Sequence, residues 1–196
     1  LSQNPWPPEN TANELYIASP SLAQPKKGGK VRWIGVSNFD REQLIRVRTI
    51  ARITSLQPPY SLVRRGAEDA ILPFCRKENI GVIAYAPMAS GLLTSAMTRE
   101  RALGLPADDW RRRSPEFNEP NLTRNLALVE RLRAVGKRLG RSPGEVAIAW
   151  TLRNPAVTGA IVGARTASQA EGVMRAAELR LSDSDAVEIE GPRERL

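Results

Sequence analysis

The feature that most constrains the fold of this chain is a fourfold alternation of short apolar runs with amphipathic stretches. The apolar runs cover residues 31–36, 53–57, 81–86 and 156–162. Runs of this length, bounded by turn residues, are typical of buried strands. Apolar strands that alternate with helices indicate parallel βα units, in which helices cover both faces of the sheet. The sequence therefore predicts an α/β fold.

Helix starts are marked by capping signals, in which Asp, Ser or Thr stands three positions before Gln or Glu. Such signals lie at residues 40–43, 142–145 and 166–169, and a proline occupies the first helical position at Pro143. Gly140 marks a helix end. The expected helices cover residues 40–51, 67–79, 122–140, 142–152, 166–178 and 182–189.

Two segments lack a regular pattern. Residues 1–30 carry five prolines and form an irregular N-terminal segment, so the main domain is expected over residues 31–196. Residues 88–120 read as a long irregular loop, which inside a compact domain is either functional or disordered. Trp110 in this loop is either a lid over a substrate or an anchor for the loop itself.

Composition narrows the chemistry that such a fold can carry. The chain has no histidine and one cysteine, Cys75, which falls on an apolar helix face. These counts exclude histidine-based catalysis, histidine metal sites, disulfides within the chain and cysteine-rich zinc sites, so no metal is expected. The cysteine usage favours a reducing cytoplasm. No apolar run reaches the length of a membrane span, so no membrane partner is expected.

The net charge of +8 raises the possibility of a nucleic-acid partner. The single arginine run is at residues 111–113, and elsewhere arginines alternate with acidic residues. Dispersed charge of this kind is typical of solvated helix faces. An RNA-binding surface would also need exposed aromatic residues, and aromatics make up only 5% of the chain. The sequence therefore predicts no nucleic-acid partner.

Two architectures fit parallel βα units: a doubly wound sheet, or part of a (β/α)8 barrel. A doubly wound nucleotide-binding protein would show a Gly-x-Gly-x-x-Gly turn after its first strand, and this chain has none. The segment around Lys30 does not match the phosphate-binding loop motif Gly-x-x-x-x-Gly-Lys-Ser/Thr either. Gln24 stands where the motif has its first glycine, and Val31 stands where it has Ser or Thr.

The residues at the predicted strand ends share one kind of chemistry. Ser37, Asn38 and Gln57 can form hydrogen bonds with a ring that bears an amide. Tyr85 can stack on such a ring, and Arg165 beside a helix start suits a phosphate. Together these residue types indicate a phosphorylated nicotinamide dinucleotide.

At these positions the sequence resembles the aldo-keto reductases. The resemblance rests on four segments in the family's order: KVRWIGVSNF at 30–39, QPPY at 57–60, AYAPMASGLL at 84–93 and GART at 163–166. It implies a partial (β/α)8 TIM-type barrel, equivalent to the C-terminal half of the family's barrel or slightly more. It also implies NADPH-dependent reduction of aldehydes or ketones.

The resemblance assigns cofactor-binding roles to strand-end residues. It implies that Ser37, Asn38 and Gln57 hold the nicotinamide carboxamide and that Tyr85 stacks on the ring. Residues implied along the pyrophosphate are Ala86, Pro87, Met88, Ser90, Gly91 and Leu92. Residues implied on the adenosine side are Gly163, Ala164, Arg165 and Gln169, with Arg165 at the 2′-phosphate of NADP(H). Ala86, Gly172 and Val173 depart from residues common in the family.

The catalytic half resembles the family less. The family's Asp, Tyr and Lys would precede residue 1, and Pro5 takes the place of its histidine, so residues 1–30 read as the remnant of a barrel strand and helix. No catalytic residue is therefore assigned. We expect impaired catalysis with a retained cofactor half; the alternative is a non-enzymatic NADP(H)-binding or partner-subunit protein. Open strand edges at 31–36 and 156–162 also predict a homodimer, or else a closed arrangement that uses residues 1–30.

Overall fold

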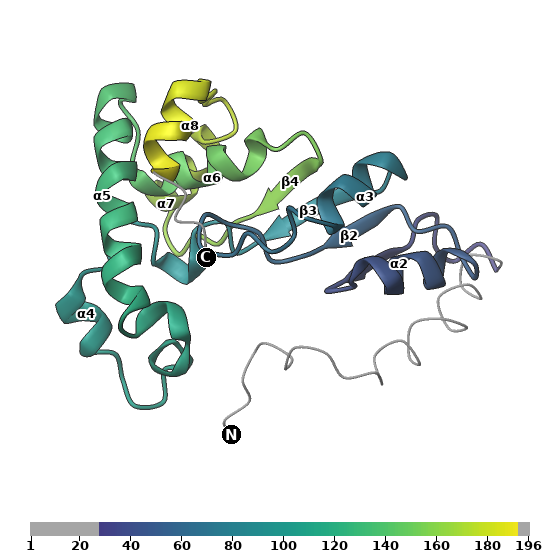
Figure 1. Cartoon of the computed structure of the whole chain (residues 1–196), viewed down its shortest axis with the longest axis horizontal. Coiled ribbons are helices and arrows are strands. Elements are labelled where there is room, and N and C mark those ends of the chain that lie inside the picture. Colours follow the sequence, from purple (N-terminus) through teal and green to yellow (C-terminus); the bar gives the residue numbers. More distant parts are fainter. Residues whose placement is uncertain (1–27, 192–196) are drawn as a thin grey trace.

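The computed structural model describes residues 28–191 and contains a four-stranded parallel sheet (Figure 1). Its strands lie in the order of the chain: β1 (Gly35–Ser37), β2 (Ser55–Gln57), β3 (Gly81–Tyr85) and β4 (Val157–Ile161). Helices alternate with these strands, as the apolar pattern predicts. Neighbouring strands joined through helices in this order form part of a (β/α)8 barrel.

The first strand is shorter than the apolar run predicts. Ile34 and Val36 are buried, but Val31 and Trp33 are 41% and 66% exposed. The ladder with β2 begins at the pair Gly35 and Ser55, so the residues before Ile34 have no strand partner in the described part of the chain. An apolar run alone therefore overestimates the strand, because pairing requires a neighbour as well as hydrophobic side chains.

The helices of the sheet units are α2 (Arg41–Arg48), α3 (Ile71–Lys77), α5 (Asn121–Leu139), α6 (Pro143–Arg153), α7 (Ala167–Arg175) and α8 (Asp183–Glu190). Three of them, α2, α6 and α7, begin at the predicted capping residues Asp40, Ser142 and Thr166. Asp40 with Gln43 and Ser142 with Glu145 form reciprocal capping boxes. Gly140 ends α5 in the left-handed conformation, with φ 65°.

Three helix predictions need correction, and the first is α2, which ends at Arg48 rather than at Ala51. Helix α3 starts at Ile71 rather than Ala67, because residues 66–70 form turns and no side chain caps the helix at Ala70. At α7, Thr166 accepts the N–H of Gln169, but the Gln169 side chain accepts from Arg165 instead of returning to Thr166. The cap is therefore one-sided, and α7 ends at Arg175, three residues earlier than expected.

The segment 88–120 has more regular structure than its sequence pattern predicts. It contains η1 (Ala89–Gly91), α4 (Arg99–Leu103), η2 (Trp110–Arg113) and η3 (Pro115–Phe117). The segment buries Leu92, Leu93, Met97, Ala102, Leu105 and Phe117. Trp110 packs edge-on against Phe117, with ring centroids 6.4 Å apart, which supports its role as a loop anchor. Helices of one turn bury too few residues to show a periodic pattern.

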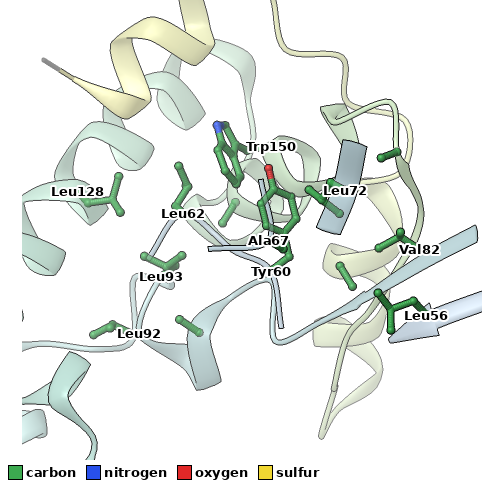
Figure 2. Close-up of a cluster of buried hydrophobic side chains, with 14 of the residues drawn as sticks. Leu56, Tyr60, Leu62, Ala67, Leu72, Val82, Leu92, Leu93, Leu128 and Trp150 are labelled. Atoms are coloured by element: carbon green, nitrogen blue, oxygen red, sulfur yellow. The ribbon is translucent and has the colours of Figure 1, made fainter. Parts of the chain in front are cut away.

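The core lies between the sheet and the helices that follow it. Leu56 and Val82 from neighbouring strands lie at one side of this cluster, and Leu62, Leu93 and Leu128 lie at the other (Figure 2). Helix α6 is buried from Pro143 to Thr151, which explains why its residues are apolar on nearly all sides. No helix in residues 28–191 is long and apolar enough to cross a membrane.

Candidate functional site

The carboxyl ends of β1 and β2 bring three predicted site residues together. Ser37 and Gln57 are partners in the ladder, and the Ser37 Oγ donates to the Gln57 carbonyl oxygen at 2.9 Å. The Asn38 N–H donates to the same carbonyl at 3.1 Å. All three residues are exposed, so the Gln57 side-chain amide remains available at the end of the sheet.

Tyr85 joins this group from the end of β3. Its Oη donates to the Asn38 Oδ1 at 2.9 Å, so the two side chains meet beyond the end of β2. Its carbonyl accepts from the backbone N–H of Tyr60 at 3.3 Å. Burial raises the pKa of Tyr85, and Arg64 and the Asn38 hydrogen bond only partly oppose that effect. The phenol is therefore neutral at pH 7, and its ring is held at the edge of the sheet.

The chain after β3 has an unusual backbone. Ala86, Ala89 and Ser90 have φ values of 54°, 47° and 56°, although only glycine adopts this region freely. Gly91 follows with φ 90°. Left-handed residues next to right-handed ones turn successive N–H groups toward one side, which suits an anion. Strained residues of this kind cluster at ligand sites, and this segment contains the predicted residues 86–92.

The end of β4 carries the remaining predicted residues. The register pairs Tyr85 with Ile161, which places Gly163 and Ala164 just beyond the neighbouring strand end. A Cβ at Gly163 would have no heavy atom within 4 Å, so the backbone there is open to a ligand. Arg165 is exposed at the start of α7, and no acidic residue lies in the first turn of that helix. A cation at a helix N-terminus forms an anion-binding arrangement.

The structure therefore joins the predicted residues in two groups. Hydrogen bonds connect Ser37, Asn38, Gln57 and Tyr85, whereas Arg165 and Gln169 are connected to each other at the next strand end. Ala89 lies inside the predicted stretch 86–92 but is not among the residues assigned individually, and its left-handed backbone is new information from the structure. Alanine normally favours right-handed backbone, so nothing in the sequence signals the left-handed conformation there.

The other reactive side chains are built into the core. Burial raises the pKa of Tyr60, whose hydroxyl donates to Glu68 at 2.8 Å and whose ring packs 5.4 Å from that of Trp150. Burial also raises the pKa of the Cys75 thiol to about 11. Neither group is therefore a ready proton donor or nucleophile. Pro5, at the place of the family's histidine, lies outside the described residues.

The described part of the chain offers no candidate metal centre. Residues 28–191 contain no cluster of three or more histidine, cysteine, aspartate or glutamate side chains that could hold a metal ion. The polar groups at the strand ends are hydroxyl and amide groups, which suit an organic ligand.

The parallel βα units and the polar groups at the carboxyl ends of the strands define a protein of the (β/α)8-barrel class, whose sites lie at that face. Comparison with known sequences assigns the family. The sequence profile described as "Aldo/keto reductase family" matches residues 4–193, and the chain belongs to this family.

Individual relatives agree with this assignment. The chain is 35% identical over 198 residues to the aldo-keto reductase YhdN of Bacillus subtilis, covering 96% of this chain and 56% of that protein. It is 28% identical over 166 residues to the aldo-keto reductase yakc of Schizosaccharomyces pombe, whose name specifies NADP(+). That match covers 83% of this chain and 48% of the relative, so the chain spans about half the length of these relatives.

Solved structures share the fold. A glycerol dehydrogenase from Gluconobacter oxydans superposes with a TM-score of 0.82 at 31% identity, over 97% of this chain and 59% of that one. A thermostable aldo-keto reductase in complex with the inhibitor epalrestat gives a TM-score of 0.68 at 23% identity, over 94% and 56% of the two chains. These superpositions identify the sheet of this chain as part of an aldo-keto reductase barrel.

Proposed function

We propose that this chain binds NADP(H) along the carboxyl ends of its strands and forms the cofactor-binding half of a carbonyl reductase. The single observation that carries the proposal is the contact between the Tyr85 hydroxyl and the Asn38 side chain. It holds an aromatic ring and an amide next to the exposed Gln57, where a nicotinamide needs both stacking and hydrogen bonds.

The residues present fit the chemistry of this cofactor. Ser37, Asn38 and Gln57 supply the hydroxyl and amide groups for the carboxamide, and Tyr85 supplies the ring. The left-handed residues in 86–92 suit a pyrophosphate because of their backbone N–H groups. Arg165 at the start of α7 suits the 2′-phosphate, which distinguishes NADP(H) from NAD(H). Gly163, Ala164 and Gln169 border the same strand end.

The proposal includes impaired catalysis by this chain. A bound nicotinamide dinucleotide supplies hydride chemistry toward an aldehyde or ketone, and the reduction also needs an acid at the carbonyl oxygen. Tyr60 is 2% exposed and bonded to Glu68, and Tyr85 has a raised pKa. Proline at position 5 has no proton to donate. The described residues therefore supply no activated acid beside the proposed ring site.

The same observations support a second candidate, a non-enzymatic protein that binds NADP(H) or serves as a partner subunit. Such a protein needs the strand-end groups but no acid. The cytoplasm is the proposed location for either candidate, because the one thiol, Cys75, is unpaired and buried, which suits a reducing compartment.

Two measurements on the full chain test these proposals. Calorimetric titration with NADPH and NADH should give saturable binding, tighter for NADPH. Oxidation of NADPH in the presence of several aldehydes and ketones, followed at 340 nm, should stay close to the rate without protein. The absence of NADPH binding would refute the cofactor site. Turnover typical of enzymes, on the order of 1 to 10 s⁻¹, would refute impaired catalysis and the second candidate.

A further inference from the structure

A second concave site lies apart from the strand ends. It is a cavity of about 440 Å³ between the loop after β2, the turn η3, helix α5 and the end of α8. None of the proposed cofactor residues lines it. Its volume falls in the range of small-molecule pockets, which is about 300 to 1,000 Å³.

One face of α5 forms a wall of this cavity. Asn121, Arg124, Asn125, Leu128 and Arg131 line it, and their spacing places them along the same side of the helix. Leu62, Val63 and Pro115 add apolar surface from the loop after β2 and from η3. The cavity therefore combines an apolar surface with cationic groups from one helix.

The acidic groups of the cavity are already engaged by the protein. Glu116 pairs with Arg64 at 2.5 Å and accepts from the Ser114 hydroxyl. Glu190 accepts from Arg65 at 2.9 Å and from the Trp150 Nε1 at 3.0 Å. Arg65 is bonded to Glu68 as well, and its guanidinium lies 5.0 Å from the Trp150 ring centroid. Both cavity carboxylates are therefore neutralised, Glu116 by Arg64 and Glu190 by Arg65, in a network of ion pairs that also includes Glu68.

Two cations remain outside that network. The Arg131 Nε donates to the Ile189 carbonyl at 2.8 Å, which fixes the side chain without neutralising it. Arg124 is exposed, and within residues 28–191 neither Arg124 nor Arg131 pairs with a carboxylate. Asn125 stays in place because its side-chain N–H donates to the Glu116 carbonyl at 2.9 Å. The cavity thus has a surplus of positive charge beside an apolar surface.

We propose that this cavity binds a small organic anion with an apolar body, such as a medium-chain monocarboxylate. The carboxylate lies at Arg124 and Arg131, whose guanidinium groups form charge-assisted hydrogen bonds with such groups. The hydrocarbon part covers Leu62, Val63 and Leu128. This site is independent of the proposed cofactor site, because the two share no residue.

The test uses octanoate as the probe and the full chain, with 1-octanol as the neutral control. Calorimetric titration should show one saturable octanoate site and affinity for octanol at least about tenfold weaker. Arg124→Gln removes an exposed cation that forms no ion pair with the carboxylates of residues 28–191, so the fold should be retained. It should weaken octanoate binding about tenfold, the effect of losing a charge-assisted contact.

Lys137→Gln is the matched control, because Lys137 is exposed on the same helix and does not line the cavity. This variant loses the same charge and should bind octanoate within about twofold of the unchanged protein, as expected for exposed charges separated beyond the screening length. Equal losses in the two variants, equal affinity for octanol, or no saturable octanoate binding would each overturn the proposal. NADPH binding, measured in the same samples, should not change with Arg124→Gln.

Discussion

Arg165 is the residue whose surroundings bear most directly on the proposed cofactor. It is exposed at the start of α7, and its backbone N–H is bonded to Gln169 at 2.8 Å. Its guanidinium has no carboxylate partner in residues 28–191. No ion pair in the described residues depends on this charge. A variant that removes the charge therefore tests ligand binding rather than stability.

We expect Arg165→Ala to weaken NADPH binding by about tenfold or more, because a hydrogen bond to a charged group contributes about 1.5–3 kcal/mol. NADH binding should change little, since NADH lacks the 2′-phosphate. Calorimetric titration with both nucleotides measures the two effects, and thermal unfolding should show an unchanged midpoint.

Arg46→Ala provides the matched control for this charge loss. Arg46 is exposed on α2 and lies outside the proposed site. This control should bind NADPH like the unchanged protein. If Arg165→Ala binds NADPH as tightly as the control does, Arg165 does not contact the 2′-phosphate.

The residue types predict the side-chain chemistry of part of the site, but they do not predict its backbone conformation. The side-chain chemistry of Asn38, Gln57 and Tyr85 can be recognised in the sequence, because amides and an aromatic ring follow strand ends. The left-handed conformations of Ala86 and Ala89 cannot be predicted, since alanine favours right-handed backbone. In the structure the Ala89 N–H donates to the Ala86 carbonyl at 2.9 Å within this turn.

At the scale of elements, helix α8 is held at its start by Asp185. The Asp185 Oδ2 accepts from the Ser182 Oγ at 2.6 Å and from the Ser182 N–H at 2.9 Å. The Oδ1 accepts from Arg138 of α5 at 2.6 Å. The hydrogen bonds from Ser182, and then the Arg138 guanidinium, lower the pKa of Asp185 from 3.8 to about 2. The same carboxylate thus caps α8 and attaches it to α5.

The lowered pKa predicts how stability depends on pH. A carboxyl group with a lower pKa in the folded state stabilises the fold above its unfolded pKa, and this stabilisation is lost as pH falls through the folded value. The Asp185 contribution should therefore be complete above about pH 4 and disappear toward about pH 2. Asp185→Asn should reduce the free energy of unfolding by about 1–2 kcal/mol at pH 7 and flatten its decline in acid, as measured by urea unfolding.

Asp183→Asn is the control on the same helix. The Asp183 side chain is 97% exposed and pairs with Arg153 at the surface, where ion pairs contribute little. This variant should keep the acid-dependent decline of the unchanged protein. If Asp185→Asn also keeps that decline, the cap of α8 is not the origin of the pH dependence.

Elements with strong local signals could be predicted from sequence. Helix α5 has a long apolar stripe and a terminal glycine, and the starts of α2 and α6 have reciprocal caps. The turns in 88–120 and the late start of α3 could not be predicted. In these places long-range burial, rather than local periodicity, selects the conformation.

At the scale of the whole molecule, the described sheet has two open edges. Strands β1 and β4 each pair with one neighbour in residues 28–191, and β4 exposes Ile161 by 43%. Unpaired strand edges attract other strands. We therefore propose that the chain forms a homodimer through these edges.

Light scattering coupled to size exclusion measures the expected dimer directly. A positive charge on an edge strand disfavours pairing, so Ile161→Lys should shift the population toward monomer, with at least about a tenfold weaker association. Val187→Lys is the control, because Val187 is 70% exposed on α8, away from the edges. A monodisperse monomer of the unchanged chain, or equal effects of the two variants, would contradict the edge-mediated dimer.

The sequence by itself determined the βα alternation, the strand-end residue types and the family. These features depend on local periodicity and on motifs at short spacing, which survive without knowledge of packing. The profile match over residues 4–193 confirms the family, and the parallel order of β1 to β4 confirms the fold class.

Only the tertiary structure decided which charges are neutralised and which remain available. Arg65 reaches Glu190 across 125 positions of the chain, whereas Arg124 on α5 has no carboxylate partner in the described residues. The two arginines are alike in sequence, and both lie near acidic residues. Their difference arises because an ion pair depends on which elements pack together, and that is set by burial of the whole core.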